Sequence, residues 1–215
     1  MPVPLKIDFV SDISCPWCVI GLRALEQAIA RLDGQVAVDL HFQPFELNPQ
    51  MPAGGQDIDE HLQQKYGSTP EQAALVRERI RAAGAALGFT FSLQTRSRIY
   101  NTFDAHRLLH WAALEGRQLA LKQALFQAYF TDGEDPSSHQ VLIRAAARVG
   151  LDATRAARIL DSNEFAAVVR KEQAFFLDQG IHAVPAVIIN NQHLIQGGQP
   201  VEVFEQALRQ IAGLA

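Results

Sequence analysis

The alternation of apolar and polar residues near the N-terminus predicts a strand, a helix and a second strand. Lys6–Val10 is a short apolar run with β-branched and aromatic side chains, which is typical of a buried strand. From Pro16 to Leu32 apolar residues recur at helical spacing, and Asp33-Gly34 follows as a stop signal. Val36–Phe42 alternates in the manner of a strand with one buried face. The chain therefore begins with a β-α-β unit.

A loop rich in proline and glycine at residues 45–55 ends this pattern, and helical periodicity dominates the sequence that follows. The segments with this periodicity are residues 58–66, 70–87, 101–115, 118–130, 138–149, 153–160 and 162–179. A long helical block therefore interrupts the α/β pattern.

The α/β pattern returns near the C-terminus. Val187–Ile189 and His193–Ile195 are short apolar runs, and Asn190-Asn191 between them predicts the tight turn of a hairpin. An amphipathic helix is predicted over residues 201–214. We therefore expect an α/β fold with a large all-helical insertion. The predicted boundaries are residues 1–53 for the first part of the α/β domain, 54–161 for the insertion and 162–215 for the second part.

The composition of the chain limits which partners and which cellular location we expect. The chain has 215 residues, of which 48% are hydrophobic, so it can bury a substantial core. Its formal net charge is -4 and its charges are interspersed without a basic stripe, which argues against a nucleic-acid partner. No apolar stretch is long enough to span a bilayer, and the N-terminus lacks the features of a secretory signal. We expect no membrane partner and a cytoplasmic location.

The two cysteines of the chain enclose Pro16 and Trp17 in one C-x-x-C motif, Cys15 to Cys18. The motif follows a predicted buried strand and opens a predicted helix, which is the context of a redox motif. Free backbone N–H groups and the helix dipole at this end stabilise an anion and favour the thiolate of Cys15. The i to i+3 spacing places Cys18 on the same face. We predict that Cys15 is the attacking nucleophile and Cys18 the resolving thiol.

Two other interpretations of the cysteine pair are a buried core pair and half of a zinc site. A zinc site needs about four ligands, and the chain has neither a second C-x-x-C motif nor an obvious histidine pair to supply them. The sequence therefore favours the redox interpretation, and we expect no metal.

Five segments of the chain carry a resemblance to a known family. They are Ser11-Asp12 before the Cys15–Cys18 motif and Gly21, and residues 44–52, 101–108, 125–130 and 180–186. In these five segments the chain resembles the DsbA-like thioredoxin-fold oxidoreductases, and most closely their cytoplasmic FrnE-type subgroup. The resemblance implies a thioredoxin-like fold with an inserted helical domain, thiol-disulfide oxidoreductase activity, and a cis-proline loop at Val184-Pro185. It implies no metal or organic cofactor.

Pro185 lies just before a predicted strand. A cis bond at Val184-Pro185 would leave the backbone of Val184 exposed to pair with a bound peptide or thiol substrate. Periodicity alone is equally consistent with an ordinary trans proline at the start of a strand. The resemblance favours the cis form.

Two residues near the motif have a functional and a structural interpretation. Asp12 is a candidate proton relay to Cys18, but an aspartate before a helix is more often a turn or cap residue. Trp17 has a flat apolar face that can contact a substrate, or it packs against the helical block.

Residues farther along the chain are weaker candidates. Asn48 and the loop with Gly198 and Gln199 are candidate contacts for a small thiol such as glutathione, and a simple loop role is equally consistent with their sequence. His106 and Arg107 lie in a predicted helix of the insertion, where we interpret them as structural.

The predicted function is thiol-disulfide exchange with a protein or small-molecule substrate, through a Cys15 mixed disulfide that Cys18 resolves. Glutathione is a candidate co-substrate. One rival is a glutathione-dependent isomerase or a kappa-type glutathione transferase, which the chain resembles in domain plan. Those enzymes activate glutathione with a serine near the position that holds Cys15 here. A second rival is a chaperone-like module that binds peptides. The oligomeric state is open between monomer and homodimer.

Overall fold

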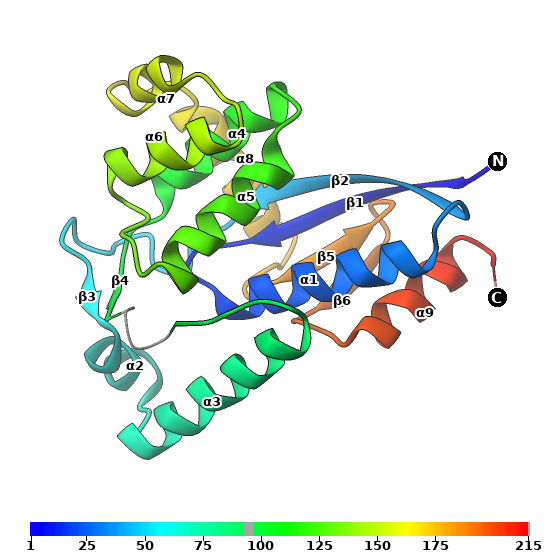
Figure 1. The fold of residues 1–215 in the computed structure, drawn as a ribbon, viewed down its shortest axis with the longest axis horizontal. Coiled ribbons are helices and arrows are strands. Elements are labelled where there is room, and N and C mark those ends of the chain that lie inside the picture. The colour runs from blue at the N-terminus through cyan, green and yellow to red at the C-terminus, as the bar shows by residue number, and fades with distance from the viewer. Residues whose placement is uncertain (93–96, 215) are drawn as a thin grey trace.

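One sheet takes its strands from both ends of the chain (Figure 1). The computed structural model describes residues 1–92 and 97–214. Within it, β1 (Val3–Ser11) pairs parallel with β2 (Val36–Pro44) and antiparallel with β5 (Ala186–Ile189). β6 (His193–Gln196) completes the order β2-β1-β5-β6. The chain leaves the sheet after β2 and returns to it at β5, as the interrupted α/β pattern predicts.

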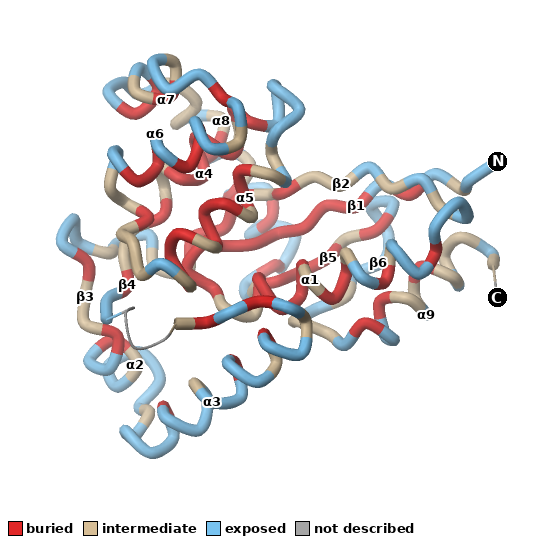
Figure 2. The backbone as a smooth tube through the Cα atoms, in the orientation of Figure 1, coloured by how far each residue is buried: buried red, intermediate tan, exposed pale blue. Residues whose placement is uncertain are grey.

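Helices cover both faces of this sheet. Alternate residues of β1 and β5 belong to two apolar clusters on opposite faces. Phe9 and Val187 belong to the cluster of α1 (Pro16–Arg31) and α9 (Val201–Ile211). Val10 and Ala186 belong to a second cluster with Phe176 of α8 (Ala166–Asp178). Because both faces are covered, the second half of β1 is buried at every position (Figure 2).

The helical block between β2 and β5 follows the predicted periodicity closely. Its helices are α2 (Ile58–Tyr66), α3 (Pro70–Ala86), α4 (Phe103–Leu114), α5 (Gln118–Phe126), α6 (His139–Arg148) and α7 (Ala153–Leu160). The predicted helix 118–130 continues after Phe126 as a π-helix, η1 (Gln127–Thr131). A short strand pair that the pattern did not predict joins β3 (Gln56–Asp57) to β4 (Arg98–Ile99). At the C-terminus α9 ends at residue 211, three residues before the predicted end at 214.

The start of α8 at residue 166 corrects the predicted start at residue 162. Phe165 has a φ of 61°, so the backbone is left-handed just before the helix and cannot continue it. The buried guanidinium of Arg107 donates to the carbonyl oxygens of Ile159, Ser162 and Glu164. Arg107 therefore holds the chain between α7 and α8 in a turn, which is a structural role.

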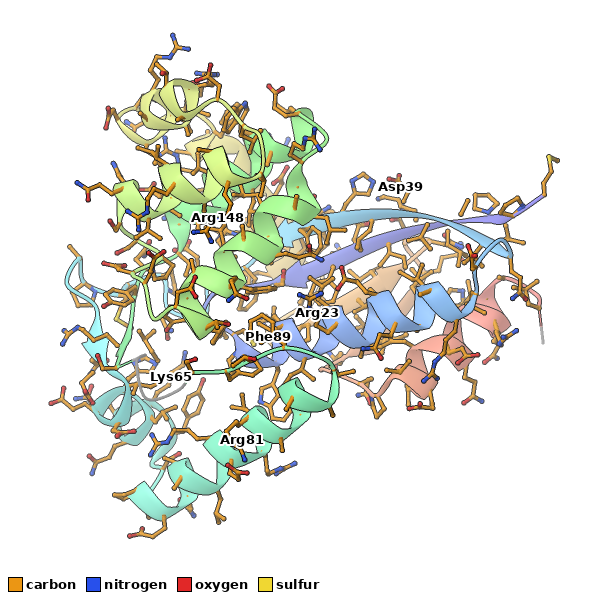
Figure 3. All side chains as sticks on the ribbon, in the orientation of Figure 1. Arg23, Asp39, Lys65, Arg81, Phe89 and Arg148 are labelled. Atoms are coloured by element: carbon orange, nitrogen blue, oxygen red, sulfur yellow. The ribbon has the colours of Figure 1, made fainter. Side chains whose placement is uncertain are left out.

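The segment after α3 crosses over α1 and ties the helical block to the sheet domain. Phe91 packs so closely on α3 that a Cβ at Gly84 would lie 2.4 Å from its ring. Phe89 lies beside α1, with the guanidinium of Arg23 5.9 Å from the ring centroid (Figure 3). These contacts place α3 beside the N-terminal end of α1, where the cysteines are.

The predicted domain boundaries at residues 53/54 and 161/162 stay a prediction. Residues 93–96 of the predicted insertion and Ala215 lie outside the described residues. Among the helices described, none combines the length and the apolar character needed to cross a bilayer.

Candidate active site

The cysteine motif sits at the junction of the central strand and the first helix. β1 ends at Ser11, and α1 begins at Pro16 with Cys15 as its N-cap residue. Proline suits the first helical position because the N–H group it lacks would have no intrahelical partner there. The side chain of Cys15 makes no capping hydrogen bond to the helix, so its sulfur is not engaged by the helix end.

The two cysteines are free thiols with different surroundings. Cys15 is 4% exposed and its Sγ donates to the carbonyl oxygen of Val184, 3.6 Å away. Cys18 has no exposed surface, and its backbone N–H donates to the carbonyl oxygen of Cys15 at 3.1 Å. Burial, together with the neighbouring Cys15, raises the pKa of the Cys18 thiol well above its usual value, and the charge of Lys122 acts in the opposite direction. Cys15 therefore is the accessible thiol and Cys18 lies behind it.

The loop before β5 packs directly on the start of α1. The peptide bond between Val184 and Pro185 is cis. A Cβ at Gly21 would lie 3.1 Å from the Pro185 ring, and a Cβ at Gly198 would lie 2.9 Å from the carbonyl oxygen of Trp17. Glycine at positions 21 and 198 thus lets two loops approach the motif at backbone distance.

We expect Gly198→Ala to lower the free energy of unfolding by about 1–2 kcal/mol, the usual cost of forcing a methyl group into a packed site. The neighbour it meets is backbone, which cannot move aside as a side chain can. Urea denaturation of both proteins measures the change. Gly54→Ala is the matched control, because a Cβ there meets nothing within 4 Å. Equal losses in the two variants would contradict this account of Gly198.

Asp12 holds the motif in place through a buried carboxylate. It accepts hydrogen bonds from the N–H and hydroxyl of Ser14, at 3.2 and 2.9 Å, and from the N–H of Leu47 at 2.7 Å. Nε2 of His106 lies 3.6 Å from Oδ1 of Asp12 and 3.0 Å from the carbonyl oxygen of Phe45. Burial alone would raise the pKa of Asp12, but His106 and the hydrogen bonds lower it to about 2. These contacts are those of a turn residue that also joins the loop after β2.

Cys15 opens onto a pocket of about 670 Å³ between the motif and the helices α2 and α3. Four of the predicted site residues besides Cys15 line it: Pro16, Trp17, Asn48 and Val184. Most of the remaining wall is apolar, with Phe45, Leu47, Ile58, Leu62, Val76 and Ile80. The arrangement offers an accessible thiol to a ligand with an apolar body.

Besides the buried residues Asp12 and Cys18, three predicted residues do not line this pocket. Pro185 is buried beneath its rim, and Gly198 packs behind Trp17. The amide of Gln199 donates to the carbonyl oxygen of Gln196, 2.8 Å away, within its own loop. Of the candidate contacts for a small thiol, only Asn48 is in a position to touch a ligand in the pocket.

Lys65 is a residue of the pocket that the sequence did not single out. It extends from the end of α2 (Figure 3), and its ammonium group donates to the carbonyl oxygen of Leu47 at 2.8 Å and to Oδ1 of Asn48 at 2.7 Å. Both partners are neutral, and its charge forms no ion pair with a carboxylate in the part of the chain described. The sequence does not distinguish Lys65 from the other charged residues of α2, so it could not be predicted as a site residue.

A buried lysine lies behind the cysteines. Lys122 of α5 has no exposed surface, and it lies four residues before Phe126 on the same helical face. That position in an apolar face was the only signal from which the sequence could have identified it. Within residues 1–92 and 97–214, no group of three or more histidine, cysteine, aspartate and glutamate side chains is placed to hold a metal ion.

Comparison with known proteins places the chain among others of the same architecture. The DSBA-like thioredoxin domain family matches residues 6–209. A probable DsbA oxidoreductase from Streptomyces coelicolor is 32% identical with a TM-score of 0.91, over 98% of this chain and 91% of that one. YwbO, an uncharacterized protein of Bacillus subtilis (strain 168), is 26% identical over 97% of this chain and 96% of its own length.

A more distant structure shares the fold alone. The cytosolic disulfide reductase DsbM of Pseudomonas aeruginosa, solved with GSH, is 17% identical with a TM-score of 0.68, over 97% of this chain and 100% of that one. Together these matches confirm the expected thioredoxin-like fold with a helical insertion.

Proposed function

Because the chain belongs to the DsbA-like thioredoxin domain family of thiol-disulfide oxidoreductases, we propose that Cys15 and Cys18 are its redox couple. The observation that carries this proposal is the difference between the two thiols. Cys15 lines the pocket, whereas Cys18 has no exposed surface and lies one helical turn behind it. A substrate in the pocket therefore reacts first with Cys15. Cys18 then resolves the mixed disulfide between Cys15 and the substrate.

The reaction proceeds in two exchanges. The Cys15 thiolate attacks one sulfur of a substrate disulfide, the substrate S–S bond breaks, and one substrate thiolate leaves. Cys18 then loses its proton and attacks Sγ of Cys15, which breaks the mixed disulfide and releases the second substrate thiolate. The protein is oxidised by two electrons and the substrate is reduced by two. The same steps in reverse oxidise a substrate dithiol.

The backbone of Val184 supports the first exchange. Its carbonyl oxygen lies 3.6 Å from Sγ of Cys15, and the residue lines the pocket. A substrate that enters beside Cys15 therefore lies next to the backbone of Val184. We infer that this backbone aligns the substrate disulfide for attack.

The pocket favours a small substrate that carries a negative charge. Its walls are largely apolar, and Lys65 contributes a cation with neutral partners near Cys15. The DsbM structure with GSH is a precedent for a glutathione site in this fold. Glutathione, a thiol with two carboxylates, is the co-substrate that we propose. A cytoplasmic location, membership of the FrnE-type subgroup and the choice between monomer and homodimer stay predictions.

Equilibration of the purified protein in graded glutathione buffers tests the couple. Thiol trapping and mass spectrometry then report the state of Cys15 and Cys18 at each ratio of reduced to oxidised glutathione. We expect a reversible two-electron transition to an intramolecular disulfide. If no such disulfide forms, and turnover of glutathione conjugates persists in Cys18→Ser, the isomerase or transferase replaces the oxidoreductase as the proposed function.

A further inference from the structure

Lys122 is a charged side chain enclosed in the apolar core. It is fully buried, and among the described residues its ammonium group has no hydrogen-bond acceptor. The ammonium group makes cation–π contacts with the rings of Phe42 and Phe126, whose centroids lie 5.7 and 5.1 Å from Nζ. Cation–π contacts of this kind offset only part of the cost of burying an unpaired charge. A methionine would fill the same volume without this cost.

The contacts of α5 place Lys122 between β2 and α1. Near one end of α5, the side-chain amide of Gln118 bonds the N–H and carbonyl groups of Phe42, at 2.9 and 3.0 Å. One residue beyond Lys122, the amide of Gln123 donates to Glu26 of α1 at 2.5 Å. The helix is thus fastened to β2 and to α1 on either side of Lys122.

The charges that act on Lys122 come from the active site. They are the thiol of Cys18 in α1, the thiol of the N-cap residue Cys15, and the carboxylate of Asp12. Burial lowers the pKa of Lys122 to about 8, and negative charge on these three groups acts to raise it. The reciprocal effect falls on Cys18, where Lys122 lowers the pKa of the thiol against the effect of burial. Glu26, also on α1, is engaged by Arg23 and Gln123.

We propose that Lys122 is a positioning residue for the resolving step, whose buried ammonium group stabilises the thiolate that Cys18 forms before it attacks the mixed disulfide. This inference rests on the proposed function. In that step Cys18 gives its proton to solvent, its sulfur bonds to Sγ of Cys15, and the bond from Cys15 to the substrate sulfur breaks. The substrate leaves as a thiolate, and the new disulfide carries no charge. Oxidation therefore removes the two thiolate partners of Lys122, leaves Asp12 as its anionic neighbour, and favours release of its proton.

A chromogenic aromatic disulfide separates the two steps in one stopped-flow trace. Attack by Cys15 releases the first coloured thiolate, and attack by Cys18 releases the second. In Lys122→Met we expect the second phase to slow by about three- to tenfold at neutral pH, and its pH profile to move to higher pH. Each unit of higher pKa reduces the thiolate fraction tenfold, and the greater nucleophilicity of the more basic thiolate recovers about half of this on a logarithmic scale. The first phase should change by less than about twofold.

Two controls separate this role from a structural one. Lys171→Met removes an exposed lysine of α8 and should leave both phases unchanged. The free energy of unfolding of Lys122→Met should be equal to that of the wild type or higher, because an apolar side chain of similar size replaces a buried charge. A second phase with wild-type rate and pH profile in Lys122→Met overturns the proposal. A missing first phase in the wild type instead contradicts the proposed function.

A measurement on the wild-type protein decides the question even if Lys122→Met does not fold. NMR titration of the Lys122 side chain gives its pKa in the dithiol and disulfide forms. The side-chain signals are assigned by connecting them to the backbone signals of the same residue. We expect a lower pKa in the disulfide form, since the thiolates are gone. The same pKa in both forms overturns the proposal.

Discussion

Cys15→Ser is expected to lose at least about a thousandfold of the disulfide-reducing activity, because a serine hydroxyl is not ionised near neutral pH and cannot replace the thiolate. Cys18→Ser should lose turnover as well, but by a different route. Its Cys15 still attacks the substrate, and the mixed disulfide persists because no second thiol resolves it. Steady-state turnover gives the loss of activity, and intact-mass measurement identifies the trapped adduct.

The positions of the two thiols determine which adduct forms. Cys15 lines the pocket and Cys18 is fully buried, so the adduct of Cys18→Ser should map to Cys15. Cys15→Ser should form little adduct, since a substrate disulfide does not reach Cys18. The same two variants treated with a small alkylating reagent provide a control for accessibility. An adduct that forms faster on Cys18 than on Cys15 is incompatible with the assigned roles.

Asp12→Asn is expected to lower the free energy of unfolding by at least about 2 kcal/mol at neutral pH. The carboxylate accepts three hydrogen bonds in a buried site, from two donors of Ser14 and one of Leu47. An asparagine has one acceptor oxygen, and its NH₂ group would face a donor, so at least one buried donor loses its partner. Urea denaturation measures the loss, and Asp39→Asn at an exposed position of β2 serves as the control.

The Asp12 carboxylate makes the free energy of unfolding depend on pH in the acid range. Its pKa is lowered to about 2 in the folded protein, against 3.8 for an ordinary aspartate. A lowered pKa in the folded state stabilises the fold above about pH 4, and this contribution is lost as the pH falls through about 2. The contribution at neutral pH is about 2 kcal/mol. The difference in stability between wild type and Asp12→Asn should therefore shrink between pH 4 and pH 2. A constant difference over this range would show that the charge of Asp12 does not stabilise the fold.

Local patterns in the sequence determined most of the secondary structure and the chemistry of the motif. Helical spacing located α2 to α7 because the side chains that cover one face of a helix lie three or four residues apart in the chain. The Asn190-Asn191 turn was equally local, since both residues adopt the positive φ angles of a tight hairpin turn, 53° and 56°. The C-x-x-C motif after a buried strand located Cys15 at the N-terminus of α1 for the same reason.

Only the tertiary structure decided what surrounds the motif. Two partners of Asp12, Leu47 and His106, are far from it in the sequence. One side of the pocket wall comes from α2 and α3, and no local pattern indicated that these helices lie beside Cys15. The turn before α8 depends on Arg107, whose acceptors lie more than fifty positions along the chain. Such contacts depend on how the helices pack, and no local period records them.

Lys122 shows the difference most clearly. In the sequence it is one lysine in a helix, and a lysine is usually placed on a solvated face. Its burial follows from the packing of α5 on β2 and α1, fastened through Gln118 and Gln123. Residue spacing determined that a dithiol opens the first helix, because that depends on neighbours in the chain. The charge behind the dithiol was decided by tertiary packing, because it depends on which helix lies against that end of the sheet.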